Sequence, residues 1–204
     1  MEWTRTTVAH RLNGNAAASV TGDHVLNPDM AAVSLHDLTP AAVLIGLVER
    51  DAGLTLLLTQ RSVDLEHHPG QISFPGGHVD DDDKTAEACA LRELEEETGI
   101  PTRHVHVAGR LPTYTTRTGF AIAPVVGFIT PPFSLRPDPR EVADIFEVPF
   151  DFLMDTANHQ RMSRDFNGKT RYFHAMSYED HYIWGATAGM LVNLHAALTG
   201  EHGS

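Results

Sequence analysis

Apolar runs separated by polar turns divide the middle of the chain into predicted strands. The polar turn 49–53 lies between two such runs, which is typical of a β-hairpin. The Gly- and Pro-containing segment 61–77 and the charged segment 137–147 are expected to be loops. The predicted strands cover residues 41–47, 54–59, 105–111 and 120–129.

Two segments have the apolar spacing of a helix. Residues 85–98 carry small and apolar side chains three and four positions apart, and Gly99 follows where a left-handed residue commonly ends a helix. Residues 186–198 form the second predicted helix, which ends at Gly200. Both helices are therefore expected to pack against the predicted strands.

The N-terminal segment has a different pattern. Trp3, Val8 and Leu12 fit a short amphipathic helix, but the polar residues that follow show no sustained period. Residues 1–38 are therefore expected to form an arm or cap, and residues 39–204 a single domain.

Composition limits the possible partners and location. The 204 residues include 42% hydrophobic residues, and 27 Asp and Glu against 15 Lys and Arg give a net charge of −12. Such a charge repels nucleic acids and anionic membranes, so neither is an expected partner. One cysteine, Cys89, excludes an internal disulfide and is expected to be a buried small hydrophobic residue. The N-terminus lacks the pattern of a signal peptide and no apolar run is long enough to cross a bilayer, so a cytoplasmic location is expected.

Carboxylates converge on one face of the helix predicted over residues 85–98. Glu93, Glu96 and Glu97 are spaced at i, i+3 and i+4, which places their side chains within one turn. Arg92 is the one cation in this segment, and the C-terminal half of a helix disfavours negative charge. Two interpretations remain open: a solvated acidic face, or a site for a hard divalent cation such as Mg²⁺ or Mn²⁺.

The residues around this helix resemble the Nudix box. The resemblance rests on Gly77, an acidic loop, and the segment from Arg92 to Ile100, which matches the end of the box at each specified position. The family places a Glu eight residues before the Arg, where this chain has Lys84, because the acidic loop is one residue longer. The partner of Arg92 is therefore expected to be Asp83 or Glu87.

Upstream residues are similar to one branch of that family, the coenzyme A diphosphatases. The similarity lies in residues 57–62, Leu-Leu-Thr-Gln-Arg-Ser, and 70–77, Gly-Gln-Ile-Ser-Phe-Pro-Gly-Gly. Segments 139–142 and 183–187 also resemble this branch, so the likeness extends over about residues 40–198. The branch typically has an Arg where this chain has Glu66, which keeps other diphosphate substrates open.

The resemblance implies an α+β fold, a Nudix-like α/β/α sandwich with a mixed β-sheet. It also implies that Glu93, Glu96 and Glu97, with the carbonyl of Gly77, hold Mg²⁺ or Mn²⁺. Glu93 is an alternative general base, because members of the family place that role on different residues.

Three further residues are candidates for the site. Glu141 is the expected further ligand or general base, and its alternative role is that of an ordinary loop glutamate. Arg61 is the expected phosphate ligand, since a guanidinium suits bidentate phosphate binding. Arg92 is expected to orient the carboxylates of the helix.

The predicted function is therefore metal-dependent hydrolysis of the diphosphate of coenzyme A or acyl-coenzyme A, giving 3',5'-ADP and 4'-phosphopantetheine or its acyl derivative. The alternatives are hydrolysis of another nucleoside diphosphate derivative, such as ADP-ribose, NADH or a nucleoside triphosphate, and a catalytically silent module that binds a nucleotide. A homodimer is compatible with the exposed sheet edges of such a fold.

Overall fold

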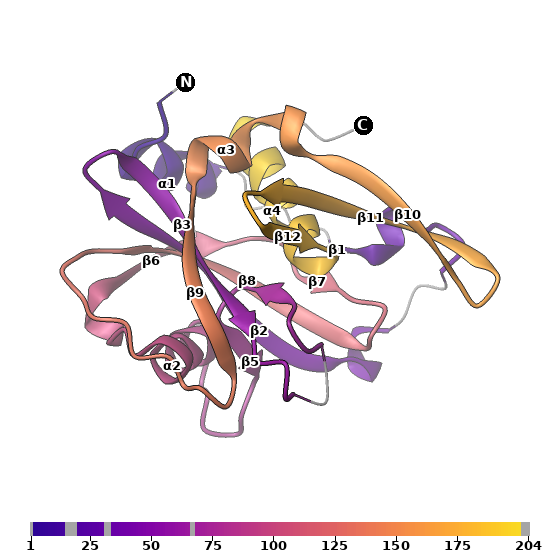
Figure 1. Ribbon diagram of the computed structural model, residues 1–204, viewed down its shortest axis with the longest axis horizontal. Coiled ribbons are helices and arrows are strands. Elements are labelled where there is room, and N and C mark those ends of the chain that lie inside the picture. The colour runs from indigo at the N-terminus through magenta and orange to yellow at the C-terminus, as the bar shows by residue number, and fades with distance from the viewer. Residues whose placement is uncertain (1, 15–19, 31–33, 66–67, 201–204) are drawn as a thin grey trace.

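The computed structural model describes residues 2–14, 20–30, 34–65 and 68–200, and its centre is a mixed nine-stranded sheet (Figure 1). The strand order is β1-β7-β8-β2-β3-β4, with β5 paired to β2, β6 to β8 and β9 to β3. The strands β2 and β8 run parallel, as do β1 and β7, and the other pairs are antiparallel. The bounds are β1 (Thr21–Gly22), β2 (Thr39–Arg50), β3 (Gly53–Arg61), β4 (Ile72–Ser73), β5 (Gly76–His78), β6 (Val105–Arg110), β7 (Tyr114–Thr115), β8 (Phe120–Ile129) and β9 (Val142–Pro149).

Helix α2 (Ala86–Thr98) covers one face of this sheet. Its apolar stripe, which includes Cys89, Ala90 and Leu94, is fully buried against residues of β2, β3 and β8 such as Leu44 and Val125. Burial of this stripe fixes the rotation of the helix, which also buries Glu97 and leaves Glu95 and Glu96 exposed.

The other face is covered by helices and a second, smaller sheet. Its cluster of buried side chains joins α1 (Arg5–Gly14), α3 (Phe150–Met154) and α4 (Ala186–Thr199) to the sheet residues Leu47, Leu56 and Phe128. The small antiparallel sheet has the order β10-β11-β12, and α4 lies behind it in Figure 1. Its strands are β10 (Gln160–Phe166), β11 (Lys169–Tyr178) and β12 (His181–Trp184), and short 3₁₀ helices cover Asp23–Val25, Leu35–Asp37, Thr102–His104 and Thr156–Asn158.

Most of the predicted regular elements are confirmed. The hairpin is β2 and β3, and the strands predicted over 105–111 and 120–129 are β6 and β8. Helix α2 begins after Thr85, whose hydroxyl accepts a hydrogen bond from the N–H of Ala88, and ends at Gly99 with φ 73°. The last helix ends at Gly200 in the same left-handed conformation. The short N-terminal helix is α1, and its Val8 and Leu12 are buried in the core.

Two loop predictions were wrong in part. The segment 137–147 contains the first six residues of β9, which pairs with β3 along Thr55–Arg61. Its polar residues hid the strand, because Glu147 contributes to the sheet by binding Arg50 and the Thr55 hydroxyl. The segment 61–77 includes β4 and most of β5, which are too short to show a period.

Among the helices of the described ranges, none combines the length and the hydropathy that a membrane span requires.

Candidate active site

The three carboxylates of α2 occupy different environments. Glu97 is 4% exposed, the side chain of Glu93 is 14% exposed and that of Glu96 is 60% exposed. The difference follows from the rotation of α2, which turns Glu97 toward the sheet and Glu96 toward solvent. The sequence predicted the shared helix surface but not this gradient of burial.

Glu97 lies against the end of strand β3 and the start of β5. One carboxylate oxygen accepts a hydrogen bond from the N–H of Gly76 at 3.4 Å, and the other lies 3.5 Å from the Thr59 hydroxyl. The pKa of Glu97 is raised to about 8, mainly by burial; the charges of Glu93 and Glu141 act in the same direction, and the Gly76 hydrogen bond and the charge of Arg61 oppose them. A buried carboxylate with so little compensating charge is a natural position for a cation.

Glu93 lies directly against the backbone of Gly77. A Cβ added at Gly77 would be 2.4 Å from a carboxylate oxygen of Glu93, so the absence of a side chain allows this approach. Burial is the main cause that raises the pKa of Glu93, and the charges of Glu96 and Glu141 act in the same direction. The Gly77 carbonyl oxygen lies 3.8 Å from the sulfur of Cys89.

Cys89 is buried beside the backbone of β5. Its exposed fraction is 0%, and burial raises the pKa of its thiol to about 11. The expectation that Cys89 is a buried residue is confirmed.

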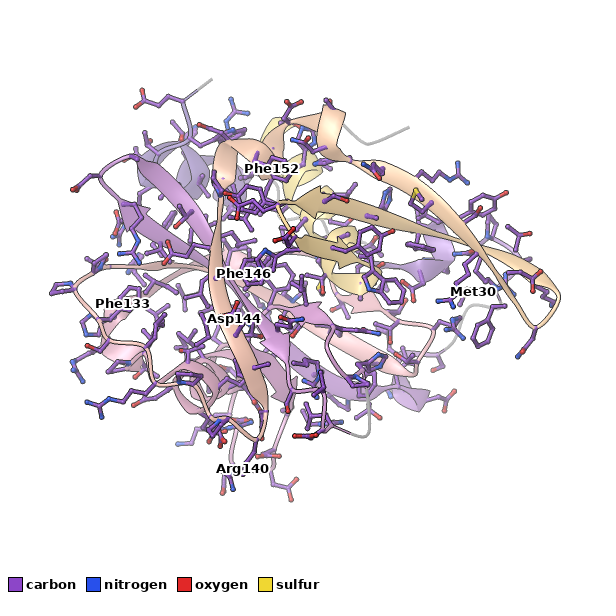
Figure 2. The ribbon with its side chains drawn as sticks, viewed as in Figure 1. Met30, Phe133, Arg140, Asp144, Phe146 and Phe152 are labelled. Carbon is purple, nitrogen blue, oxygen red and sulfur yellow. The ribbon has the colours of Figure 1, made fainter. Side chains whose placement is uncertain are left out.

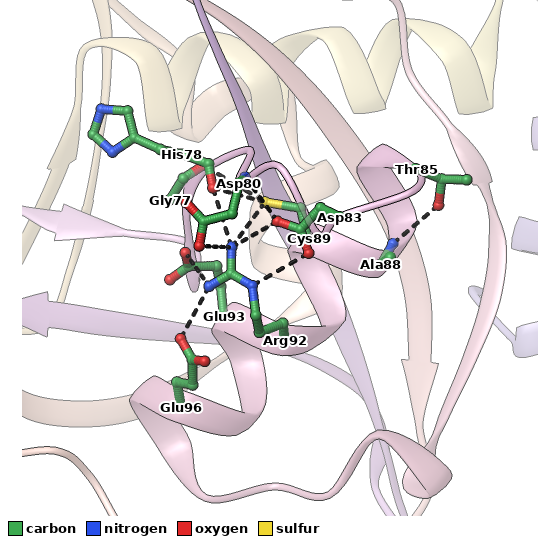
Figure 3. Close-up of polar contacts among 10 residues, drawn as sticks. All are labelled: Gly77, His78, Asp80, Asp83, Thr85, Ala88, Cys89, Arg92, Glu93 and Glu96. Carbon is green, nitrogen blue, oxygen red and sulfur yellow. Dashed lines mark hydrogen bonds and ion pairs between the residues drawn. The ribbon is translucent and has the colours of Figure 1, made fainter.

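Arg92 links the acidic loop to the carboxylates of α2 (Figure 3). Its guanidinium donates to both oxygens of Asp83, at 3.2 and 2.8 Å, and to the carbonyl of His78 at 3.1 Å. The same group donates to Glu93 at 2.8 Å and to Glu96 at 3.0 Å. Asp83 is thus the partner that replaces the expected Glu, whereas Glu87 pairs with Arg110.

Glu141 reaches the site from the segment before β9. The loop is attached to the end of α2 because Arg136 and Asp138 donate backbone hydrogen bonds to the carbonyls of Thr98 and Glu97. Glu141 in turn donates its N–H to the Asp138 carbonyl and accepts from the N–H of Ser62. In Figure 2, Arg140 lies just before β9, at the end of the strand beside α2. The structure thus brings Glu141 near Glu93 and Glu97, whose pKa values its charge raises.

Arg61 is the last residue of strand β3. The Nε of Arg61 is buried and has no hydrogen-bond partner among the residues that the structure describes, while its positive charge lowers the pKa of Glu97. A buried N–H donor without an acceptor is costly, so the guanidinium is suited to an anionic ligand. Glu66, which departs from the resembled pattern, lies outside the described residues.

The donor set fits a hard divalent cation. Carboxylate oxygens of Glu93 and Glu97 lie beside the Gly76–Gly77 backbone, and such oxygen donors suit Mg²⁺ or Mn²⁺. Among the described residues, no three His, Cys, Asp or Glu side chains are already arranged closely enough to hold a metal ion. That is compatible with Mg²⁺, which commonly takes one or two protein carboxylates and completes its shell with water and substrate phosphate.

Sequence reasoning missed two groups that position Glu97. Thr59 lies on β3, which pairs with β2 and β9, and Gly76 lies on β5, which pairs with β2. Neither residue has a sequence spacing relative to α2 that would indicate contact with Glu97. The available signal was the pair Gly76–Gly77, because a Cβ at Gly76 would lie 2.5 Å from the carbonyl oxygen of Ala42.

Comparison with known proteins places the chain in a family. Residues 37–166 match the NUDIX domain. The Escherichia coli K12 protein named uncharacterized Nudix hydrolase NudL is 42% identical over 154 residues, which cover 76% of this chain and 80% of that protein. A Shigella boydii protein of the same name has the same identity and coverage. The chain therefore belongs to the Nudix hydrolase family, whose members generally use divalent metal ions and act on small-molecule diphosphates.

Solved structures also resemble the chain. A Caenorhabditis elegans Ap4A hydrolase in a binary complex is 19% identical and has a TM-score of 0.47, with coverage of 54% of this chain and 80% of that one. A Deinococcus radiodurans protein is 13% identical and has a TM-score of 0.49, with coverage of 79% and 85%. The family match and the observed elements together define an α+β Nudix fold with a mixed β-sheet and four α-helices in the described residues.

Proposed function

We propose that this Nudix hydrolase cleaves the diphosphate of coenzyme A or an acyl-coenzyme A, giving 3',5'-ADP and 4'-phosphopantetheine or its acyl derivative. The observation that carries the proposal is that both segments act on the buried Glu97 carboxylate: the N–H of Gly76 donates a hydrogen bond to it, and the positive charge of Arg61 lowers its pKa. These residues belong to the two segments, 57–62 and 70–77, that resemble the coenzyme A diphosphatases.

Glu93 and Glu97 would hold Mg²⁺ or Mn²⁺, and Glu96 would join them after exchanging its bond with Arg92. When bound, the ion would neutralise the diphosphate oxygens and make a water molecule more acidic. The Gly77 carbonyl is the proposed backbone ligand. Arg92 would hold Glu93 and Glu96 in place through the network anchored at Asp83.

The chain's own groups would position the diphosphate and remove a proton. Arg61 would bind a phosphate oxygen through its unpartnered Nε. The Glu141 carboxylate, fixed through its backbone to Asp138 and Ser62, would accept the proton of the attacking water. Glu93 is the alternative base. The pH dependence of turnover in Glu141→Gln and Glu93→Gln separates these roles, because the variant that lacks the base loses the fall in activity at acidic pH.

The test is hydrolysis of a panel of diphosphates: coenzyme A, acetyl-coenzyme A, ADP-ribose, NADH and dGTP, with and without Mg²⁺ or Mn²⁺. We expect coenzyme A to yield 3',5'-ADP only when metal is present. Preferred cleavage of another compound would contradict the substrate assignment and keep the diphosphatase chemistry. No cleavage of any compound, with nucleotide binding retained, would favour a silent binding module.

A further inference from the structure

Strand β10 is an open edge of the small sheet. Its seven residues are all exposed, and the β10–β11 hairpin extends away from the body of the molecule (Figure 1). A two-residue turn of Asn167 and Gly168, both with positive φ, closes the hairpin and fixes its register, in which Phe166 lies opposite Lys169. Exposed edge strands present unpaired backbone groups that can pair with another strand.

The contacts of β11 show which backbone groups of β10 face the open edge. The N–H and carbonyl of Tyr172 bond the side chain of Asn27, and the carbonyl of His174 accepts from Gly185. These groups therefore point away from β10. Two residues that lie opposite each other in an antiparallel pair either both point their backbone groups toward the neighbouring strand or both point them away from it. Ser163 lies opposite Tyr172 and Arg161 lies opposite His174, so the N–H and carbonyl groups of Ser163 and Arg161 point away from β11.

Backbone orientation alternates along a strand, so the N–H and carbonyl of Asp165 also point away from β11. Three residues of β10 therefore present backbone groups with no partner among the described residues. They are Arg161, Ser163 and Asp165, and their side chains share one face of the strand. Arg161 and Asp165 have opposite charges and lie at equal distances in sequence from Ser163. This symmetry matters because a two-fold axis through an antiparallel strand pair places residues equidistant from the centre opposite each other.

We propose that β10 pairs antiparallel with β10 of a second copy of this chain, about a two-fold axis at Ser163. In this register the outward groups of all three residues exchange hydrogen bonds with their counterparts. Arg161 lies opposite the partner's Asp165, and Asp165 lies opposite the partner's Arg161. The two small sheets then join into one continuous six-stranded sheet.

The charges on β10 select this register among those centred on neighbouring residues. A centre at Arg161, Arg164 or Asp165 places that residue opposite its own copy, so like charges meet. A centre at Met162 places Arg161 opposite the partner's Ser163 and forms no ion pair. The centre at Ser163 forms two ion pairs between directly opposed residues.

Charge distribution also favours a copy of this chain over a nucleic acid. The hairpin carries four basic residues and one acid, Asp165, in a chain with 27 acidic and 15 basic residues. A basic edge alone would resist self-pairing, and Asp165 is the residue that makes it self-complementary. The guanidinium of Arg161 lies 4.6 Å from the ring centroid of Tyr172, which orders the side chain before pairing.

The test is sedimentation velocity of the full chain over a concentration series, combined with amide hydrogen exchange. We expect a monomer–dimer equilibrium that weakens as salt rises. Exchange of the Arg161, Ser163 and Asp165 amides should slow as the dimer fraction rises. The amides of Met162 and Arg164, which face β11, should be protected at every concentration. A chain that stays monomeric, or a dimer that leaves the three outward amides unprotected, would overturn the proposal.

Charge variants give a second, independent test. Arg161→Asp places two carboxylates opposite each other and should weaken the dimer about tenfold or more. Arg164→Asp is the matched control, because it changes the net charge equally but lies opposite the partner's Met162, so it should have a much smaller effect. If the two variants weaken the dimer equally, general charge repulsion explains the effect and the two ion pairs are refuted.

The charge swap Arg161→Asp with Asp165→Arg should restore association. Because the Asp165 side chain also accepts from the N–H of Gly168, protection of the Met162 amide checks that the swapped hairpin folds. If the swapped hairpin does not fold, Ser163→Pro replaces the swap as the deciding variant, since it removes an outward N–H that β11 does not use. A dimer of wild-type strength in Ser163→Pro would contradict the proposal.

Discussion

Arg92 donates two hydrogen bonds to Asp83, at 3.2 and 2.8 Å, and this pair closes the acidic loop onto the helix that carries the candidate metal ligands. The Asp83 side chain is 6% exposed. Asp83 therefore takes the place of the glutamate that the family pattern specifies. It lies one residue farther from Arg92 than that glutamate would, because the loop is one residue longer. The shorter side chain and the longer loop compensate for each other.

Asp83→Asn should reduce stability with a definite pH dependence. The hydrogen bonds from Arg92 lower the pKa of Asp83 to about 2, below the value of about 3.9 expected in the unfolded chain. A lowered pKa means that the folded state binds fewer protons, so the contribution of Asp83 is complete above about pH 5 and is lost as the pH falls toward 2. Urea unfolding of both proteins from pH 7 to pH 3 should show their stability difference shrinking.

Asp82→Asn is the control for that measurement, since Asp82 is exposed and lies in the same loop. It should unfold like the unmodified chain at each pH. A difference between Asp83→Asn and the unmodified chain that stays constant down to pH 3 would show that the carboxylate charge of Asp83 does not stabilise the fold.

Glu97→Gln should remove activity and preserve the fold. The amide keeps the shape of the side chain and its contact with Gly76 but loses the charge that a cation needs, so turnover should fall about 100-fold or more. Steady-state hydrolysis at saturating Mg²⁺, with circular dichroism of both proteins, measures this. Glu95→Gln is the matched control, because Glu95 lies on the same helix and bonds the N–H of Thr102 away from the site. Equal turnover of Glu97→Gln and the unmodified chain would exclude Glu97 as a metal ligand.

Gly77→Ala should impair catalysis more than stability. The added methyl group would lie 2.4 Å from the Glu93 carboxylate, which is the flexible end of a side chain and can move aside. The displaced carboxylate should lower turnover about tenfold or more, in line with the effect of misplacing a catalytic group. Gly109→Ala has space for its Cβ, with the nearest atom 3.9 Å away, and should match the unmodified chain in turnover and melting temperature. Loss of the folded state in Gly77→Ala would contradict the expected side-chain displacement.

Arg61→Lys should weaken substrate binding, although the positive charge remains. Lysine lacks the planar fork that binds phosphate through two N–H groups, so kcat/KM should fall about 10-fold to 100-fold. Initial rates over a range of substrate concentrations separate KM from kcat. Arg50→Lys, which affects an exposed pair with Glu147, is the matched control and should have no effect on either constant. Unchanged kinetics of Arg61→Lys would show that Arg61 does not bind the diphosphate.

Local patterns in the sequence were sufficient for the elements with strong periodicity. Helix α2 was predictable to within a residue because its apolar spacing and Gly99 act over a few neighbouring positions. The convergence of Glu93, Glu96 and Glu97 on one helix surface followed from the same spacing. The fold itself came from the resemblance of motifs, because no local pattern specifies which strands pair.

Tertiary structure decided what depends on contacts between distant residues. Strand β9 was hidden because its stability comes from pairing with β3, and its polar residues find partners there. The choice of Asp83 over Glu87 for Arg92 depended on how the acidic loop folds back. The gradient of burial from Glu96 to Glu97, and the approach of Arg61 and Glu141, arise from the packing of α2, β3 and the loop before β9. Sequence therefore determined which residues carry charge on the helix, and packing determined which of those charges is buried, held by Arg92 or open to solvent.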